Sequence, residues 1–223
     1  MKRFFSLLFS LLILGGIIFI LTTGSPGIDL LTLIPRQSSA VVTWDRPARD
    51  YQRFVRTRLG KNISNIDRES VLTALGLSAA DSTTVSTVVK LWHALTQKPL
   101  FQDILGKKIV LALVPGKARG RSASHPSMEP LFLSAVTRQT GTRMRSFLHG
   151  FQGVTTLPTV TYQGYTIYGF TIRDIGPLYV ACSRGVLLAA FDPAPIRKSL
   201  DLLLAGLVGK GDTIRGNPMF LKM

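Results

Sequence analysis

An uncharged apolar segment near the N-terminus constrains this chain more than any other feature. Residues 4–21 read FFSLLFSLLILGGIIFIL and contain neither a charged residue nor a proline. As a helix that rises about 1.5 Å per residue, a segment of this length covers roughly 27 Å, which is close to the hydrocarbon thickness of a bilayer. The sequence therefore predicts one transmembrane helix, which anchors the protein in the lipid bilayer through residues 4–21.

A cleaved signal peptide is the alternative interpretation of the same segment. Lys2 and Arg3 would form its cationic start, and Thr22 and Gly24 supply small residues before a cleavage point. The apolar segment is longer than the usual core of a signal peptide, however, and no A-x-A pattern follows it. We therefore expect a retained anchor.

The charges that flank the segment predict its orientation. Lys2 and Arg3 precede it, whereas residues 28–40 carry one cation, Arg36, and one anion, Asp29. The positive-inside rule leaves the N-terminus in the cytoplasm and exports the rest of the chain. The expected location is the inner (cytoplasmic) membrane, with a single span and an extracytoplasmic body.

Beyond the anchor, the sequence predicts an α+β body of antiparallel hairpins packed with amphipathic helices. We expect a cationic start and anchor over 1–24, a juxtamembrane linker over 25–39 and the body over 40–223, with a subdivision near 115–130 as an open alternative. Periodicity and turn residues predict strands at 40–44, 108–114 and 131–136, helices at 46–59, around 71–75, from Ser82 to Pro99 and at 142–151, hairpins over 157–191, and a last helix from Asp192 or Pro193.

The order of these elements suggests an internal repeat. A strand, helix and hairpin order begins at Ala40 and occurs again after Leu131, which is typical of two related units that share a core. The chain ends in TIRGNPMFLKM, where a new apolar segment starts without a polar cap. Either the body is truncated at its C-terminus or this end packs onto the body, and we expect truncation.

The sequence carries no recognisable catalytic or metal-binding motif. His93, His125 and His149 are far apart, and neither H-E-x-x-H nor G-x-S-x-G nor a complete phosphate-binding loop occurs. We therefore assign no catalytic residue, no metal site and no cofactor, and an envelope hydrolase stays only as an alternative. The single cysteine, Cys182, lies in an apolar stretch and is predicted to be a buried, inert thiol.

Positive charge is the most unusual property of the exported part. The chain has 27 Lys and Arg against 12 Asp and Glu, a net charge of +15. Four arginines at positions i, i+3, i+7 and i+10 of the helix expected at 46–59 predict one solvent-facing stripe, and the polar loop adds three more cations. These candidate contacts for an anionic partner are Arg46, Arg49, Arg53 and Arg56 in the stripe, and Lys117, Arg119 and Arg121 in the loop.

Two interpretations of this charge stay open. A charged helix face that keeps the body soluble is the default. The functional interpretation is attraction to anionic lipid head groups, to an acidic glycan or to an acidic protein of the envelope. Export separates the cations from DNA, and no aromatic RNA-binding motif occurs, so no nucleic acid partner is expected.

Three segments of the body carry a resemblance to a known family. They read LTLIPRQSSAVVTW, LYVACSRGVLLAAFDPAPIRKSLDLL and IRGNPMF. They resemble, over most of residues 34–220, the bacterial family catalogued as domain of unknown function 3352, whose members have an N-terminal membrane anchor. In such proteins the segment like 217–220 lies inside a longer chain, which agrees with a truncated body. The resemblance implies no catalytic residue and no activity.

The expected function is a non-enzymatic, structural or interaction role for a membrane-anchored protein of the cell envelope. The alternative is a basic binding module for anionic lipid, glycan or an acidic protein partner.

Overall fold

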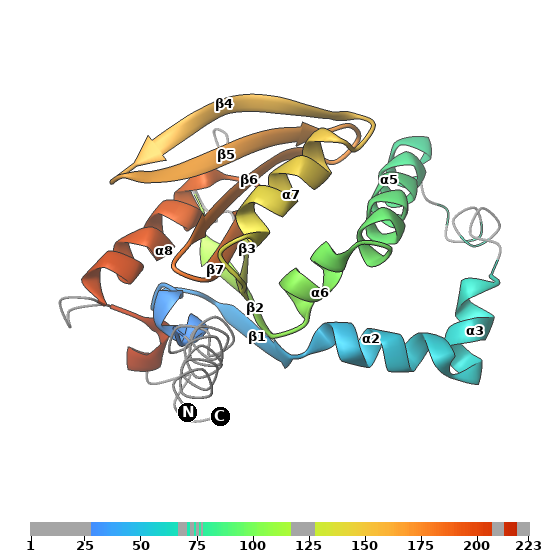
Figure 1. Ribbon diagram of the computed structural model, residues 1–223, viewed down its shortest axis with the longest axis horizontal. Coiled ribbons are helices and arrows are strands. Elements are labelled where there is room, and N and C mark those ends of the chain that lie inside the picture. The colour runs from blue at the N-terminus through green and yellow to red at the C-terminus, as the bar shows by residue number, and fades with distance from the viewer. Residues whose placement is uncertain are drawn as a thin grey trace, which may run out of the picture.

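A seven-stranded antiparallel sheet forms the centre of the fold (Figure 1). Its strand order is β1-β2-β3-β7-β6-β5-β4, so β1 and β4 are the two edges. The expected α+β class with antiparallel hairpins is thereby confirmed. The strands are β1 (Ala40–Asp45), β2 (Lys108–Pro115), β3 (Met128–Ala135), β4 (Val154–Tyr162), β5 (Tyr165–Ile172), β6 (Gly176–Ser183) and β7 (Val186–Ala190).

The computed structural model describes residues 28–66, 71, 74, 76, 78–116, 128–206 and 212–217. The predicted anchor at 4–21 lies outside these residues, as do most of the helix expected around 71–75 and most of the polar loop near 115–130. Within the described ranges, no helix combines the length and the apolar composition that crossing a bilayer requires.

Two tight turns fix the hairpins of the second half of the sheet. Gln163 and Gly164 join β4 to β5 with φ angles of 48° and 81°, and Arg184 and Gly185 join β6 to β7 with φ angles of 49° and 79°. Two consecutive positive φ angles are the mark of the turn whose twist matches that of paired strands, and glycine adopts them without steric cost. Both turns lie within the hairpins that the turn residues predicted over 157–191.

One face of the sheet packs against α8 (Pro193–Ala205) and the short 3₁₀ helix η1 (Leu30–Leu33). Asp192 caps α8, because its carboxylate accepts a hydrogen bond from the Ala194 N–H at 2.7 Å. Ile196 and Leu200 are fully buried beneath this helix. The side chains that complete this half of the core come from alternate positions of the strands, such as Val110, Ala112, Val114, Leu131, Leu133 and Leu188.

The opposite face packs against α6 (Pro99–Leu105) and α7 (Thr140–His149). Phe101 and Ile104 of α6 and Leu148 of α7 are buried there. The Ser134 hydroxyl of β3 donates a hydrogen bond to the Ile104 carbonyl, which ties α6 to the sheet. At Gly141 an added Cβ would lie 2.8 Å from the Cβ of Cys182, so α7 approaches β6 as closely as a glycine allows.

The structure corrects several expected boundaries. Leu30, Leu33 and Ile34, which were expected in a juxtamembrane linker, are buried in the core. The subdivision considered near residues 115–130 falls between β2 and β3, which pair with each other along their length. Both sides of that segment therefore belong to one sheet.

The helix expected at 46–59 is two helices, α2 (Pro47–Arg56) and α3 (Arg58–Ser64). Thr57 is extended at φ −71° and ψ 160°, and its hydroxyl oxygen accepts a hydrogen bond from the Gly60 N–H at 3.0 Å, so it caps α3. Gly60 was expected to end the helix but lies inside α3. The single helix that the periodic pattern predicts is interrupted at Thr57, because this residue caps the next helix.

The long helix α5 (Ala79–Thr96) stands away from the sheet, next to α6 (Figure 1). Its cap is Ser78, whose hydroxyl accepts a hydrogen bond from the Asp81 N–H at 3.2 Å, so the helix begins earlier than the Ser82 cap that was expected. None of its residues is fully buried. The predicted apolar face packs against the core only through Trp92 and Leu95, at its C-terminal half.

Candidate functional site

The candidate site begins where β1 passes into α2. Arg46 links them in the left-handed conformation at φ 57°, and Pro47 occupies the first turn of the helix. A residue before proline is disfavoured in the right-handed helical region, so Arg46 stays outside α2. Pro47 and Ala48 are buried, whereas Tyr51 is half-buried against the core. These contacts fix the helix on the body and turn its other faces outward.

All four arginines of the predicted stripe are exposed. Arg49, Arg53 and Arg56 lie on α2, and Arg46 precedes it. Residues 45–61 hold six cations and two carboxylates, because Arg58 and Lys61 of α3 extend the basic sequence. We name α2 and α3, together with Arg46, the cationic arm. Lys117, Arg119 and Arg121 lie outside the described residues.

A carboxylate within the cationic arm is held by a tryptophan of the sheet. The indole N–H of Trp44 donates a hydrogen bond to Asp50 Oδ2 at 2.9 Å, and Arg49 Nε lies 3.5 Å from Asp50 Oδ1. The pKa of Asp50 lies below its ordinary value, and the hydrogen bond from Trp44 is the largest cause. Burial raises this pKa, whereas the charges of Arg49 and Arg53 lower it further. Asp50 is therefore ionised at neutral pH and orients the Trp44 ring.

Trp44 also belongs to an exposed apolar surface on the sheet. In the β1–β2 register Val42 pairs with Leu111, Trp44 with Ile109 and Ala40 with Leu113, so these side chains share one face. Ile109 is buried, because α6 covers its end of that face. Val42 is 62% exposed, Trp44 50%, Leu111 45% and Leu113 41%. We name these four exposed side chains the apolar sheet face.

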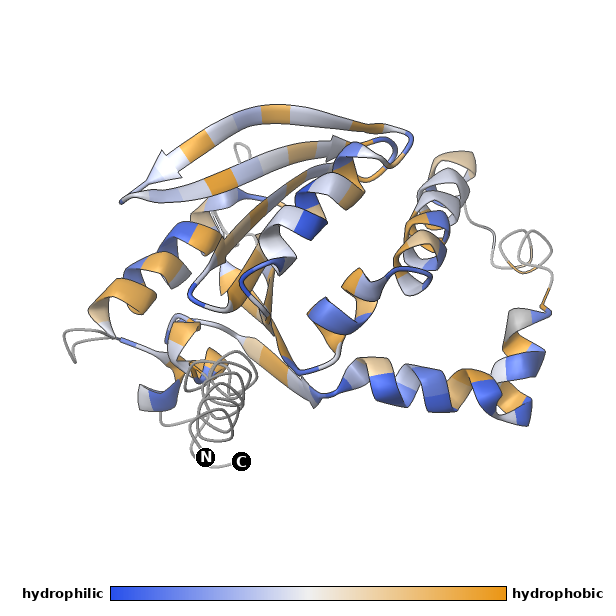
Figure 2. Ribbon diagram, in the orientation of Figure 1, coloured by the Kyte–Doolittle hydropathy of each residue, from blue (hydrophilic) through white to orange (hydrophobic). Residues whose placement is uncertain are grey.

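The apolar sheet face continues toward the centre of the sheet. Leu113 pairs with Pro130 of β3, and Leu111 pairs with Phe132, which is only partly buried. Met128, at the start of β3, and Phe191, directly after β7, are exposed as well. Contiguous apolar side chains on the surface are uncommon unless they serve binding. Figure 2 shows the apolar strand β1 leading into the mainly hydrophilic α2.

Sequence reasoning predicted the arginines but missed the apolar sheet face. The stretch KIVLALV is apolar at every position after its lysine, so it reads as a strand that is buried on both faces. The structure covers Val110, Ala112 and Val114 with α8 and η1 but leaves Leu111 and Leu113 uncovered. The sequence indicated this exposure only weakly: the partner strand, AVVTW, is followed directly by the charged start of a helix.

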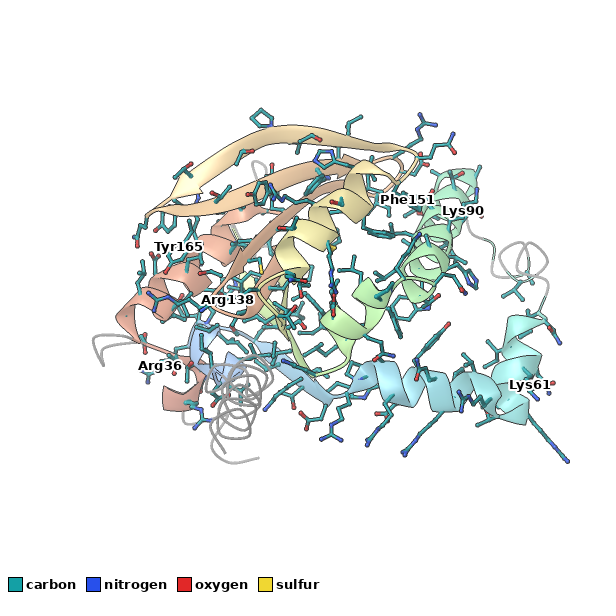
Figure 3. The ribbon with its side chains drawn as sticks, viewed as in Figure 1. Arg36, Lys61, Lys90, Arg138, Phe151 and Tyr165 are labelled. Carbon is teal, nitrogen blue, oxygen red and sulfur yellow. The ribbon has the colours of Figure 1, made fainter. Side chains whose placement is uncertain are left out.

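Apart from this surface, a groove lies between α5 and the turn that joins β5 to β6. This groove has a volume of about 1160 Å³, and its walls include Ile63, Val85, Val89 and Phe151 with the cations Lys90 and Arg173. Figure 3 labels Lys90 and Phe151 on its two sides. Thr84 Oγ1 donates a hydrogen bond to the Asp174 carbonyl at 2.7 Å, which links α5 to the turn.

The remaining polar candidates have structural roles. His149 Nδ1 lies 3.3 Å from Thr156 Oγ1, and its ring packs edge-on against Phe170 at 5.7 Å between centroids. Cys182 is half-buried beside α7, and burial raises the pKa of its thiol. Among the residues that the structure describes, no three His, Cys, Asp or Glu side chains gather as metal ligands would. His125 lies outside them.

Comparisons with protein-family models, with curated proteins and with solved structures gave no match to this chain. The resemblance to the bacterial family of domain of unknown function 3352 stays a prediction.

Proposed function

We propose that this chain is a non-enzymatic, membrane-anchored protein of the bacterial cell envelope whose exported body binds an acidic protein partner. In this proposal residues 4–21 anchor it in the inner membrane with the N-terminus in the cytoplasm. The observation that carries the binding role is the juxtaposition of the cationic arm with the apolar sheet face, joined through the Trp44–Asp50 hydrogen bond.

The composition of this surface favours a protein over a lipid headgroup or a glycan. Five of the six cations in residues 45–61 are arginines. A guanidinium binds a carboxylate through two parallel hydrogen bonds, which a lysine ammonium cannot do. Exposed tryptophan and arginine beside an apolar surface are also the residues that dominate binding energy at protein interfaces.

The expected loss of binding free energy can be estimated from the exposure of the arginines. An exposed ion pair contributes about 0.5 kcal/mol. Loss of three such pairs therefore costs about 1.5 kcal/mol, which corresponds to roughly a tenfold change in affinity. The three arginines of α2 are the set to reverse, because all are exposed and none is part of the core.

The experiment compares two charge-matched triple variants of the full chain. One is Arg49→Glu, Arg53→Glu and Arg56→Glu in the cationic arm. The control is Arg138→Glu, Arg173→Glu and Arg184→Glu, at exposed positions in three turns outside the cationic arm. A fluorescent peptide rich in Glu and Val is titrated with each protein at low and at raised salt. The anisotropy change gives the dissociation constant.

The expected result is at least a tenfold weaker affinity for the arm variant and less than a threefold change for the control. Equal losses in both variants would show that only net charge matters and would contradict a defined site. Binding to anionic vesicles in place of the peptide would assign the arm to the membrane surface instead. A periplasm-dependent reporter fused after Met223 tests the proposed orientation, and activity only of a cytosolic reporter would refute it.

A further inference from the structure

We propose that the partner docks by strand addition, with an extended acidic segment pairing along the free edge of β1 as an eighth strand. This inference rests on the proposed function, because it specifies how the acidic partner would bind at the same surface. Four observations carry it: the contrast between the two edges of the sheet, the outward-facing backbone groups of β1, its exposed side chains and the charge beside it.

The two edge strands differ in the features that normally prevent edge pairing. β4 contains Pro158, and its register with β5 shifts between Leu157 and Val160. A proline and an irregularity of this kind protect a sheet edge from further strands. β1 keeps an unbroken register with β2 from Ala40 to Asp45 and contains no proline, and its only charge is at its last residue. In the part of the chain that the structure describes, one edge is therefore protected, and the other, which we call the open edge, pairs only with β2.

The hydrogen-bonding groups on the open edge follow from the register. The Arg46 N–H donates to the Lys107 carbonyl at 3.0 Å, just beyond the last β1–β2 pair. In an antiparallel ladder such pairs recur at every second residue, so the backbone groups of Ala40, Val42 and Trp44 face β2. Those of Val41, Thr43 and Asp45 face outward. In the described part of the chain, only β2 pairs with β1.

The side chains of β1 suit an added strand. Val42 and Trp44 point from the same face as Leu111 and are among the most exposed large apolar side chains of the described residues. Alternate side chains of an added strand would lie beside Val42 and Trp44 and extend this apolar row. Main-chain hydrogen bonds then supply affinity, and the apolar row with the charged neighbours supplies specificity.

Charge selects an acidic segment over a second copy of this chain. β1 leads directly into α2 along the lower border of the molecule in Figure 1, so a strand that runs beyond Asp45 passes close to the cationic arm. Residues 45–61 of each copy hold six cations against two carboxylates, and the whole chain carries +15. Two copies joined along β1 would therefore repel each other, whereas carboxylates on an extended segment complement the arm.

The test compares two variants of the full chain, each with a different substitution at Thr43. Thr43→Pro removes an outward N–H and leaves the β2 ladder intact, because a proline is tolerated on an edge where its nitrogen faces solvent. Thr43→Val keeps the N–H and is the matched control. The probe is a labelled peptide that alternates Val with Thr and ends in Glu. A second peptide of the same composition with prolines at alternate positions cannot form a strand.

We expect Thr43→Pro to weaken binding of the strand-forming peptide at least tenfold, Thr43→Val to change it less than twofold, and the proline peptide not to bind. Hydrogen exchange provides a readout that needs no variant: the bound peptide should slow exchange at Val41, Thr43 and Asp45 at least tenfold. Unchanged exchange at these amides would overturn strand addition, even if Thr43→Pro proves too unstable to study.

The outcomes separate this inference from the function on which it rests. If Thr43→Pro binds as the unmodified chain does while the triple arginine variant of α2 does not, strand addition is wrong and the cationic arm alone binds. If reversal of the arginines leaves affinity unchanged, the proposed function fails. A dimer of the unmodified chain in sedimentation that Thr43→Pro dissociates would make a second copy the occupant and would overturn the acidic segment.

Discussion

Three aromatic rings join α2 of the cationic arm and α5 to α6, and the coupling free energy between two of them can be measured. Tyr51 of α2, Trp92 of α5 and Phe101 of α6 contact one another edge to face, with ring centroids 5.3, 5.5 and 5.6 Å apart. Phe101 is buried in the core, whereas Tyr51 and Trp92 are half-buried. The three rings form a contact that joins α2, α5 and α6.

The perturbation is a double-mutant cycle with Tyr51→Leu and Trp92→Leu. Each substitution removes two of the three ring contacts, and an edge-to-face pair contributes about 0.5–1.5 kcal/mol beyond its buried area. Each single variant should therefore lower the free energy of unfolding by about 1–3 kcal/mol. The double variant should lose less than the sum, because the shared Tyr51–Trp92 contact is removed only once. The expected coupling free energy is about 1 kcal/mol.

Urea denaturation followed by circular dichroism gives the four free energies, and Trp92→Leu with Tyr165→Leu serves as the control pair. Tyr165 packs against the half of the core that α8 and η1 cover, on the opposite face of the sheet from Trp92, so its effect should add to that of Trp92→Leu. A Tyr51–Trp92 coupling below roughly 0.3 kcal/mol, within the error of additivity, would refute the conclusion that these rings join α2 to α5.

Three further expectations concern single side chains. Ser134→Ala leaves the buried Ile104 carbonyl without its hydrogen bond and should lower the free energy of unfolding in urea by about 1–2 kcal/mol; a loss under roughly 0.5 kcal/mol would contradict a structural role for this bond. The raised pKa of the Cys182 thiol should make its labelling by a disulfide reagent at pH 8 at least tenfold slower in the native chain than in urea, and equal rates would show that the thiol is accessible. The hydrogen bond from Tyr162 to the Asp201 carboxylate raises the pKa of that phenol above its ordinary value of about 10, so its stabilisation is complete below pH 10 and is lost as the pH rises through the raised pKa. The melting temperature should therefore fall more steeply above pH 10 in the unmodified chain than in Tyr162→Phe, and parallel curves would disprove the link.

Most secondary structure could be predicted from local pattern. The strand at 40–44, the strand at 108–114, the helix with Leu148 on its face and the glycine turns at 163–164 and 184–185 are all present. Each depends on short-range physics: apolar period, β-branching, or the positive φ that glycine permits. Errors arose where a nearby side chain could change a boundary, as at Thr57, which caps α3, and Ser78, which caps α5.

The candidate site was predictable only in part. Arg49, Arg53 and Arg56 are exposed, as their helical spacing predicted, but Phe54 and Val55 of the expected apolar face are exposed as well, so the spacing alone does not explain the exposure. Arg46 was expected on the same helix, but Pro47 excludes it from the first turn. The sequence offered no way to know that Trp44 meets Asp50, because that contact depends on how β1 and α2 join.

The amino-acid sequence by itself determined most of the elements, their order, the antiparallel hairpins and the basic character of the surface, because these depend on residues close together in the chain. Only the tertiary structure decided that, within the described residues, β1 pairs with β2 alone, that Leu111 and Leu113 are exposed while Val110 and Ala112 are buried, and that Leu30 and Leu33 belong to the core. Strand order and helix coverage are set by contacts between distant segments. An apolar strand carries the same local pattern whether or not a helix covers it.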